Sequence, residues 1–439
     1  MKKVSFHRAL ALVSWMVGIS NLTACYGPSQ NFPVGSELWL KSNPEWSLIE
    51  KTGTLERKSV LVAVLDGGFD YNHPRLAKHL VPFVAPPESG RNYGIGFDLL
   101  SGDLDFFPHF SVLDPESGVD GSETMMIRDH GSHVAGLVTL KNERIGLLPI
   151  RVLPLPMDRL GDATVGEMME NPETKVKFTI LAVEQVGKGV RLACQHGAQV
   201  LNLSLGIDYS NVGSEEARAR IEAVVASDLI SPIRNLCQNS LLVAAAGNES
   251  REMLSQNQTL PATLSEANIL SVGALNSKGQ MAYFSNQGKF VDVFMRGADI
   301  KSAVPEADAA LPMDAVKKLS GTSMASPLAA HVAARVLIEA PMLSPLEVRA
   351  LILNTADLKE LQTERVPAPD GTSYAEGEVA PLPDGLPEKR MGLVVNPPRA
   401  IRAAAEISRA FRAGISTEQT HALRNRYLVA PFEHGNSPF

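Results

Sequence analysis

Three features are scarce in this 439-residue sequence: clustered basic residues, long apolar runs and cysteine. No dense block of Lys and Arg occurs and the net charge is -7, so the chain lacks the basic patch of nucleic-acid-binding proteins. The apolar run at residues 9–20 is too short for a comfortable membrane span. Only three cysteines occur, so the chain can form at most one internal disulfide. No internal repeat is visible.

The remaining composition is that of a soluble globular protein, with 44% apolar and 20% charged residues. The length suffices for one large α/β domain or two ordinary domains. The 34 glycines and 29 prolines indicate many loops.

The N-terminus has the parts of a secretory signal: Lys2, Lys3 and Arg8, then the apolar run, then LTAC at residues 22–25. A cysteine directly after Leu-Thr-Ala resembles the bacterial lipobox, in which that cysteine is lipidated and becomes the first residue. An ordinary signal that happens to end near a cysteine is the alternative. We expect a signal peptide over 1–24 and lipid on Cys25. The protein would then be an exported lipoprotein anchored in the bacterial cell envelope, at the outer membrane or periplasmic face if the host has two membranes.

Continuous apolar runs alternate with helix-like stretches from residue 59 onward. The runs are SVLVAVLDGGFD (59–70), GAQVLNLSLG (197–206) and SLLVAAAGN (240–248). Strands that are buried on both faces have continuous apolar sequences of this kind, and parallel sheets consist of such strands. The pattern predicts an α/β fold with a doubly wound, mostly parallel sheet flanked by helices. Functional groups of such folds gather beyond the carboxyl ends of the strands.

The C-terminal half predicts two helices and a final strand. The helices are expected at 324–339 and, with Ser344 as N-cap and Glu347 completing a capping box, from about 345. Residues 357–391 are rich in Pro, Gly and acids and are predicted to form a surface loop, and 392–401 a closing strand and turn. The predicted division is a tether at 25–58, a catalytic domain at 59–405 and a tail at 406–439.

Three stretches carry an acid, a histidine and a serine at predicted element boundaries: VAVLDGGFD with Asp66, DHGSHVAGLV with His130 and LSGTSMASP with Ser323. A serine hydroxyl is a poor nucleophile at neutral pH. It needs a base to take its proton, and the base needs an acid that holds its tautomer and balances its charge. Taken alone, each residue has an ordinary explanation. Asp66 fits a turn at the end of a strand equally well, and Ser323 fits a loop that caps a helix.

The three stretches, together with AAAGNES around Asn248, resemble the blocks of the subtilisin-like serine proteases in the family's chain order. The resemblance covers residues 59–405 and implies a subtilisin-like fold and serine endopeptidase activity. It implies that Ser323 is the nucleophile, His130 the general base and Asp66 its orienting acid. The side chain of Asn248 and the N–H of Ser323 would form the oxyanion hole.

The resemblance also implies how a substrate binds. The segment Ser204, Leu205 and Gly206 would pair with an extended peptide as an extra strand. Ala246 and Gly247 would border an open primary pocket for large apolar side chains. A peptide or protein substrate is therefore expected and no cofactor for catalysis, while the oligomeric state is not indicated.

Some positions depart from the family pattern. Ser132 replaces a threonine, Leu328 and His331 replace histidine and glycine, and Met295-Arg296-Gly297 replaces Ala-Pro-Gly. These changes motivate a rival hypothesis, a catalytically inactive binding or scaffold lipoprotein. A serine esterase is disfavoured because no Gly-x-Ser-x-Gly elbow surrounds Ser323. Only about 33 residues separate Cys25 from the catalytic domain, fewer than a self-folding domain needs, so no removable inhibitory prodomain is expected.

The insertion between Asp66 and His130 carries five acids, which either bind calcium or form a solvated acidic loop: Asp98, Asp103, Asp105, Asp114 and Asp120. The solvated loop is the favoured alternative, and no metal site is assigned. His133 and His73 are expected to be structural, and Asp70, His109 and Asp129 solvated or locally hydrogen-bonded. Cys194 and Cys237 either pair or lie as buried thiols.

Overall fold

The computed structural model describes residues 58–84, 93–100, 102, 121–153, 159–160, 163–164, 172–209, 212, 214–254, 258–305, 315–367, 380–414 and 417–438. The predicted signal, Cys25 and the tether before residue 58 lie outside these residues. Within them, no helix combines the length and the apolarity that crossing a membrane requires.

A nine-stranded sheet forms the centre of the molecule, in the order β16-β17-β13-β12-β10-β8-β1-β5-β4. Its strands are β1 (Val60–Asp66), β4 (Phe97–Asp98), β5 (Ile145–Arg151), β8 (Val200–Leu203), β10 (Leu241–Ala245), β12 (Ile269–Leu275), β13 (Val293–Arg296), β16 (Asp357–Gln362) and β17 (Lys389–Val394). Neighbours pair in parallel, except β16 with β17. The predicted mostly parallel sheet is confirmed.

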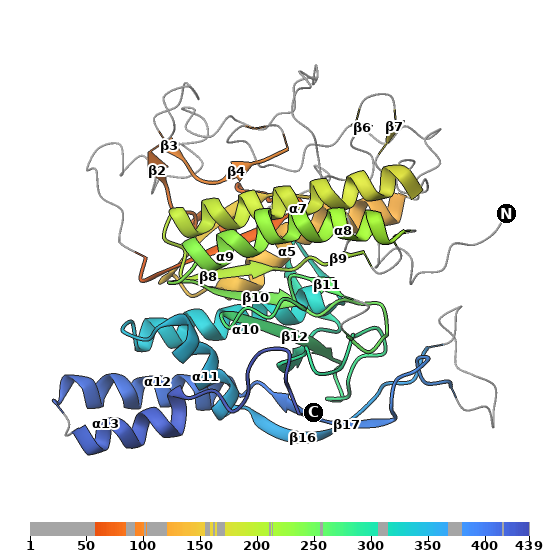
Figure 1. Cartoon of the computed structure of the whole chain (residues 1–439). Coiled ribbons are helices and arrows are strands. Elements are labelled where there is room, and N and C mark those ends of the chain that lie inside the picture. Colours follow the sequence, from red (N-terminus) through yellow and green to blue (C-terminus); the bar gives the residue numbers. More distant parts are fainter. Residues whose placement is uncertain are drawn as a thin grey trace.

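Helices cover both faces of this sheet (Figure 1). One layer contains α5 (Gly121–Thr139), α10 (Thr322–Glu339), α11 (Pro345–Thr355) and α12 (Pro397–Arg412), and the other contains α7 (Pro172–Gln195), α8 (Glu215–Val224), η2 (Val225–Ile230) and α9 (Ser231–Leu236). Val62 and Val64 of β1 join the core under the first layer, whereas Ala63 and Leu65 join the core under the second. Burial on both faces explains why the strand is a continuous apolar run.

The remaining elements are short. They are α4 (Pro74–Ala77), α13 (Thr417–Leu423), η3 (Arg424–Leu428) and four antiparallel pairs: β2 (Phe83–Val84) with β3 (Tyr93–Gly94), β6 (Arg159–Leu160) with β7 (Ala163–Thr164), β9 (Ile207–Asp208) with β11 (Thr259–Leu260), and β14 (Ile300–Ala303) with β15 (Val316–Leu319). The predicted capping box of Ser344 and Glu347 is present at the start of α11.

One prediction for the C-terminal region is wrong. The segment 357–391, predicted as a loop, supplies the strand β16 and the start of β17. The tail predicted at 406–439 is folded over its described residues, because α12 continues to Arg412 and buries Ala400, Ala403, Ala404 and Ile407 on one face. Beyond η3, His434 is fully buried against Asp292. The division into catalytic domain and tail stays a prediction.

Cys194 and Cys237 are paired, with their sulfur atoms 2.04 Å apart and 43 positions between them in the sequence. The bond joins the end of α7 to the residue after α9, within one helix layer. Of the two alternatives that the sequence left open, the structure therefore has the disulfide.

Candidate active site

Asp66 and His130 meet at the carboxyl end of β1. Nδ1 of His130 lies 2.8 Å from Oδ1 and 3.0 Å from Oδ2 of Asp66. The backbone N–H of Gly67 also donates to Oδ1, at 2.8 Å. Asp66 is 1% exposed and His130 6% exposed. A buried carboxylate on Nδ1 fixes the tautomer in which Nε2 carries the lone pair, as a general base requires.

Gly131 makes this contact between strand and helix possible. A Cβ atom at Gly131 would lie 2.1 Å from the carbonyl oxygen of Gly68 and 3.2 Å from Oδ1 of Asp66. The backbone of α5 can therefore approach the end of β1 only where a residue without a side chain follows His130.

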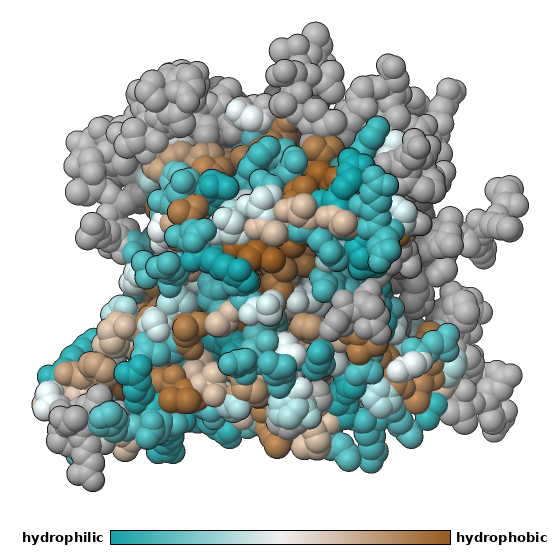
Figure 2. Space-filling model, in the orientation of Figure 1, coloured by the Kyte–Doolittle hydropathy of each residue, from teal (hydrophilic) through white to brown (hydrophobic). Residues whose placement is uncertain are grey.

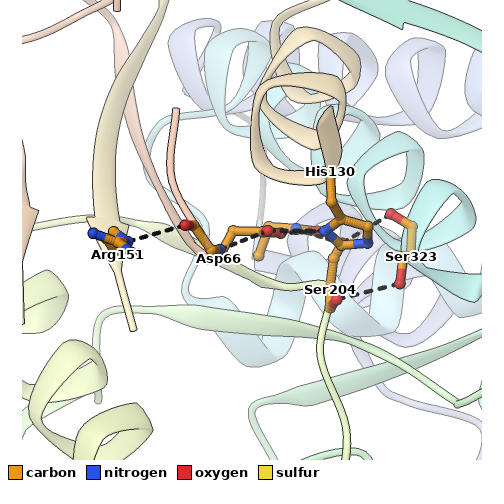
Figure 3. A network of polar contacts seen from close by, with 7 residues as sticks. Asp66, His130, Arg151, Ser204 and Ser323 are labelled. Carbon is orange, nitrogen blue, oxygen red and sulfur yellow. Dashed lines mark hydrogen bonds and ion pairs between the residues drawn. The ribbon is translucent and has the colours of Figure 1, made fainter. Parts of the chain in front are cut away.

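Ser323 lies in the first turn of α10, on the side of the imidazole that faces away from Asp66 (Figure 3). Its hydroxyl donates to the carbonyl oxygen of Ser204 at 3.2 Å. Nε2 of His130 is buried and has no hydrogen-bond partner among the described residues. The structure thus brings the three predicted residues together without the serine–histidine bond. Hydrogen bonds of this kind are often loose in free enzymes and tighten when substrate binds.

A buried network that the sequence did not reveal holds the nucleophile's backbone. Oγ of Ser204 donates to the carbonyl oxygen of Ser323 at 2.9 Å and accepts from Nδ2 of Asn202 at 2.9 Å. Oγ of Ser326 donates to Oδ1 of Asn202 at 2.9 Å. The sequence does carry a sign of this network. The segments LNLSLG and TSMASP place polar residues at strand and helix positions that would otherwise be apolar.

Asn248 has a fixed amide orientation. Its Oδ1 accepts from the backbone N–H of Thr322 at 2.8 Å and from Oγ1 of Thr322 at 3.1 Å. A Cβ atom at Gly321 would lie 3.6 Å from Nδ2 of Asn248 and 3.6 Å from the backbone N of Ser323. The two predicted oxyanion donors thus lie near each other at the start of α10, and their role as an oxyanion hole stays a prediction.

The predicted substrate segment follows β8 directly, and Ser204, Leu205 and Gly206 are all buried. Ala246 is also buried, and the space beside Gly247 is filled, because a Cβ there would lie 2.5 Å from both Asn286 Nδ2 and Glu249 Oε2. Gly247 thus serves close packing, and a wide apolar pocket stays a prediction. No sequence motif indicated Glu249. Burial raises the pKa of this carboxyl, whereas Arg251 and the amide of Asn286 oppose the increase.

The other histidines in these stretches are structural, as predicted. Nε2 of His133 donates to the carbonyl oxygens of Ile300 (2.8 Å) and Lys317 (3.1 Å), and burial lowers its pKa to about 4. Nδ1 of His73 accepts from the N–H of Arg75 and caps α4. Neither ring contacts Ser323.

The acids outside the triad are engaged locally. Asp129 pairs with Lys317 at 2.6 Å, and Oδ1 of Asp70 accepts from the N–H of Asn72. Asp98 is 1% exposed and paired with Arg151 at 2.8 Å, so the solvated-loop hypothesis is wrong for this residue. Asp103, Asp105, Asp114, Asp120 and His109 lie outside the described residues. Among the described residues, no group of three or more His, Cys, Asp or Glu side chains could hold a metal ion.

Two departures from the family pattern are accommodated away from the triad. Oγ of Ser132 accepts from the N–H of Asp70 at 2.8 Å, a bond that a threonine hydroxyl could equally make. Nδ1 of His331 donates to the carbonyl oxygen of Val138 at 2.8 Å and ties α10 to α5. Burial lowers the pKa of His331.

Comparison with known proteins identifies the family of the chain. The model of the subtilase family matches residues 57–379. A cell wall-associated protease of Bacillus subtilis (strain 168) is 32% identical over 231 residues, which cover 52% of this chain and 21% of the relative. Subtilisin of Bacillus pumilus is 28% identical over 298 residues, which cover 68% and 84% of the two chains. The structure of a cold adapted subtilisin-like serine proteinase is 23% identical, with a TM-score of 0.43 and coverage of 69% and 85%.

The chain spans 21% of the length of the cell wall-associated protease, and 56% and 60% of two further Bacillus relatives, a thermophilic serine proteinase and subtilisin amylosacchariticus. The family assignment does not depend on how much of each relative is covered, because the family model matches residues 57–379 of the 439 residues of this chain. The chain belongs to the subtilase family.

Proposed function

We propose that the protein is a serine endopeptidase that hydrolyses peptide bonds through Asp66, His130 and Ser323. The observation that carries the proposal is the buried imidazole of His130, which is held by Asp66 at 2.8 Å and presents an unpartnered Nε2 on the side of Ser323. With Nδ1 held by the carboxylate, Nε2 is the ring nitrogen that can accept the proton of a serine hydroxyl.

In the proposed reaction, the Ser323 hydroxyl leaves the Ser204 carbonyl and gives its proton to Nε2 of His130. The serine oxygen attacks the peptide carbonyl, and the resulting oxyanion accepts from Nδ2 of Asn248 and the N–H of Ser323. His130 then protonates the leaving amine, and water repeats the sequence on the acyl-enzyme. Asp66 stays ionised and balances the imidazolium. This chemistry needs no cofactor.

An extended peptide is the proposed substrate, because the segment from Ser204 to Gly206 lies at the end of β8, next to the nucleophile. Strand addition there would let the peptide's N–H groups compete for the Ser204 carbonyl oxygen, which now accepts from Ser323. Binding of the peptide would thereby free the hydroxyl to turn toward His130.

We also propose that the protein is exported and anchored in the cell envelope by lipid on Cys25. The signal-like residues 1–24 and the LTAC sequence support this proposal. Mass spectrometry of the natural protein should find a lipidated N-terminal Cys25, and Cys25→Ser should release it from the membrane fraction. An N-terminus near residue 59 would contradict both the anchor and the expected lack of a removable prodomain.

A catalytically inactive binding protein is the second candidate, since the Ser323 hydroxyl is bonded to Ser204 and not to His130. Hydrolysis of an unfolded protein substrate separates the two candidates. The native chain should cleave it and Ser323→Ala should not, whereas Ser227→Ala, an exposed serine on η2, should keep full activity. Equal activity of Ser323→Ala and the native chain would overturn the endopeptidase assignment.

A further inference from the structure

The end of the molecule away from the active site concentrates exposed apolar side chains. Eight large apolar side chains are exposed among the described residues. Five of them lie where helices end, or begin, beside the amino ends of the strands: Leu140, Leu236, Met342, Leu346 and Phe411. We call this surface the amino-edge face. Single exposed apolar residues need no explanation, but their accumulation on one face indicates an interaction surface.

Local contacts join the starts of β1 and β5 to the end of α10 at this edge. Arg144, which precedes β5, donates to Oγ of Ser59, just before β1, and to the carbonyl oxygen of Ile338 in the last turn of α10. α12 packs against α10. Figure 1 shows α12 and α13 projecting from this side of the body, away from β9, which follows the carboxyl end of β8.

The same face is positively charged. Residues 397–428 contain six arginines and two glutamates, a net charge of +4 in a chain of net charge -7. Arg402, Arg409 and Arg412 on α12 are exposed, and Arg412 directly follows Phe411, which is 50% exposed. Figure 2 shows hydrophilic and apolar residues interspersed where α12 and α13 lie. Two acids near the face are engaged, Glu143 with Lys78 and Glu347 in the capping box of α11, while Glu339 ends α10 at the same edge.

The turn after α5 is also strained. Leu140 and Lys141 have φ values of 38° and 62°, in the left-handed region that bulky side chains rarely adopt. This backbone conformation holds an exposed leucine beside an exposed lysine at the amino-edge face. Strain of this kind persists where function requires it.

Basic residues interspersed with exposed leucine, methionine and phenylalanine match the interface of an anionic lipid bilayer, where cations meet headgroups and apolar side chains enter the acyl boundary. We propose that the amino-edge face docks on anionic phospholipid. This inference rests on the proposed membrane anchor. Docking by this face would turn the Asp66–His130–Ser323 site away from the bilayer, toward substrates in solution.

The test uses a fluorophore on the lipidated full chain. Because Cys194 and Cys237 are paired and Cys25 would carry lipid, Ala413→Cys supplies the one reactive thiol, next to Arg412. In vesicles of phosphatidylglycerol with phosphatidylcholine, brominated lipid should quench this label. In phosphatidylcholine alone it should not, and 1 M salt should abolish quenching because the Debye length falls to about 3 Å.

The triple variant Arg402→Gln, Arg409→Gln, Arg412→Gln should weaken docking by about 100-fold, since each cation near an anionic leaflet contributes about fivefold. The matched control replaces exposed Lys188, Arg191 and Arg220 of the opposite helix layer by glutamine and should dock normally. Equal quenching in both vesicle types, or in both triple variants, would overturn the proposal. Flotation with phosphatidylcholine vesicles tests the anchor separately, and cleavage of a soluble peptide tests the enzyme separately.

Discussion

Asn248 contributes to the site through one atom, because Thr322 occupies its Oδ1 and leaves Nδ2 on the side of Ser323. Asn248→Leu removes that donor and keeps the volume of the side chain. We expect kcat to fall about 100- to 1,000-fold, the loss known for this kind of donor in subtilisin, with little change in KM. The donor serves the oxyanion and not the ground-state carbonyl. Asn235→Leu, at an exposed position of α9, should leave both constants unchanged, and an Asn248→Leu enzyme with native kcat would exclude the oxyanion role.

At the same scale, the sequence motifs predict which residues form the site but not the atoms that each one contacts. Asp66, His130, Ser323 and Asn248 stand in short motifs whose residue types are dictated by proton transfer and anion stabilisation. The bond from Ser323 to the Ser204 carbonyl could not be predicted, since no motif encodes the rotamer of a hydroxyl.

At the scale of elements, the segment that follows η3 is fastened to the sheet through His434, and we call this segment the C-terminal strap. His434 contacts Oδ2 of Asp292 through Nδ1 (2.7 Å) and the carbonyl oxygen of Ala262 through Nε2 (2.9 Å), so both ring nitrogens face acceptors. Arg349 of α11 pairs with the other carboxylate oxygen of Asp292 at 2.6 Å. Burial disfavours the Asp292 anion, but His434 and Arg349 outweigh it and lower the pKa of this carboxyl.

Removing His434 leaves the Asp292 anion buried with one hydrogen-bond partner fewer. We expect His434→Leu to reduce the free energy of unfolding by about 3 to 5 kcal/mol, the range for breaking a buried ion pair. His421→Leu, at an exposed position of α13, should change it by less than about 0.5 kcal/mol. Urea unfolding measures both variants, and equal stabilities would show that the strap is only loosely attached.

The elements that the sequence predicted correctly are those whose pattern is local. β1, β8 and β10 are buried on both faces and read as apolar runs, and α11 carries its capping box in four consecutive residues. β16 carries charged residues at several exposed positions, so its pairing with β17 leaves no apolar signature. The C-terminal strap depends on a partner 142 positions away, which no local pattern encodes.

At the scale of the whole molecule, two buried histidines make folding sensitive to acid. Burial lowers the pKa of His79 and of His133 from 6.5 to about 4. Between these values the unfolded chain binds protons that the folded chain does not bind, so stability is retained above pH 6.5 and lost as the pH falls toward 4.

Each of these histidines should account for up to about 3 kcal/mol of the loss, at about 1.4 kcal/mol for each unit of pKa. Urea unfolding at several pH values from 8 to 4 should show this decline, and His133→Gln should make it shallower. The exposed-site variant His421→Leu should keep the native slope. A stability that does not change between pH 8 and pH 4.5 would contradict the buried neutral state of both rings.

The proposed mechanism requires that His130 activates Ser323, which fluorophosphonate labelling with mass-spectrometric mapping can measure. We expect one adduct, on Ser323, formed at least about 1,000-fold more slowly in His130→Ala, because the serine then lacks its base. An unlabelled Ser323 in the native protein, or labelling that His130→Ala does not slow, would contradict it.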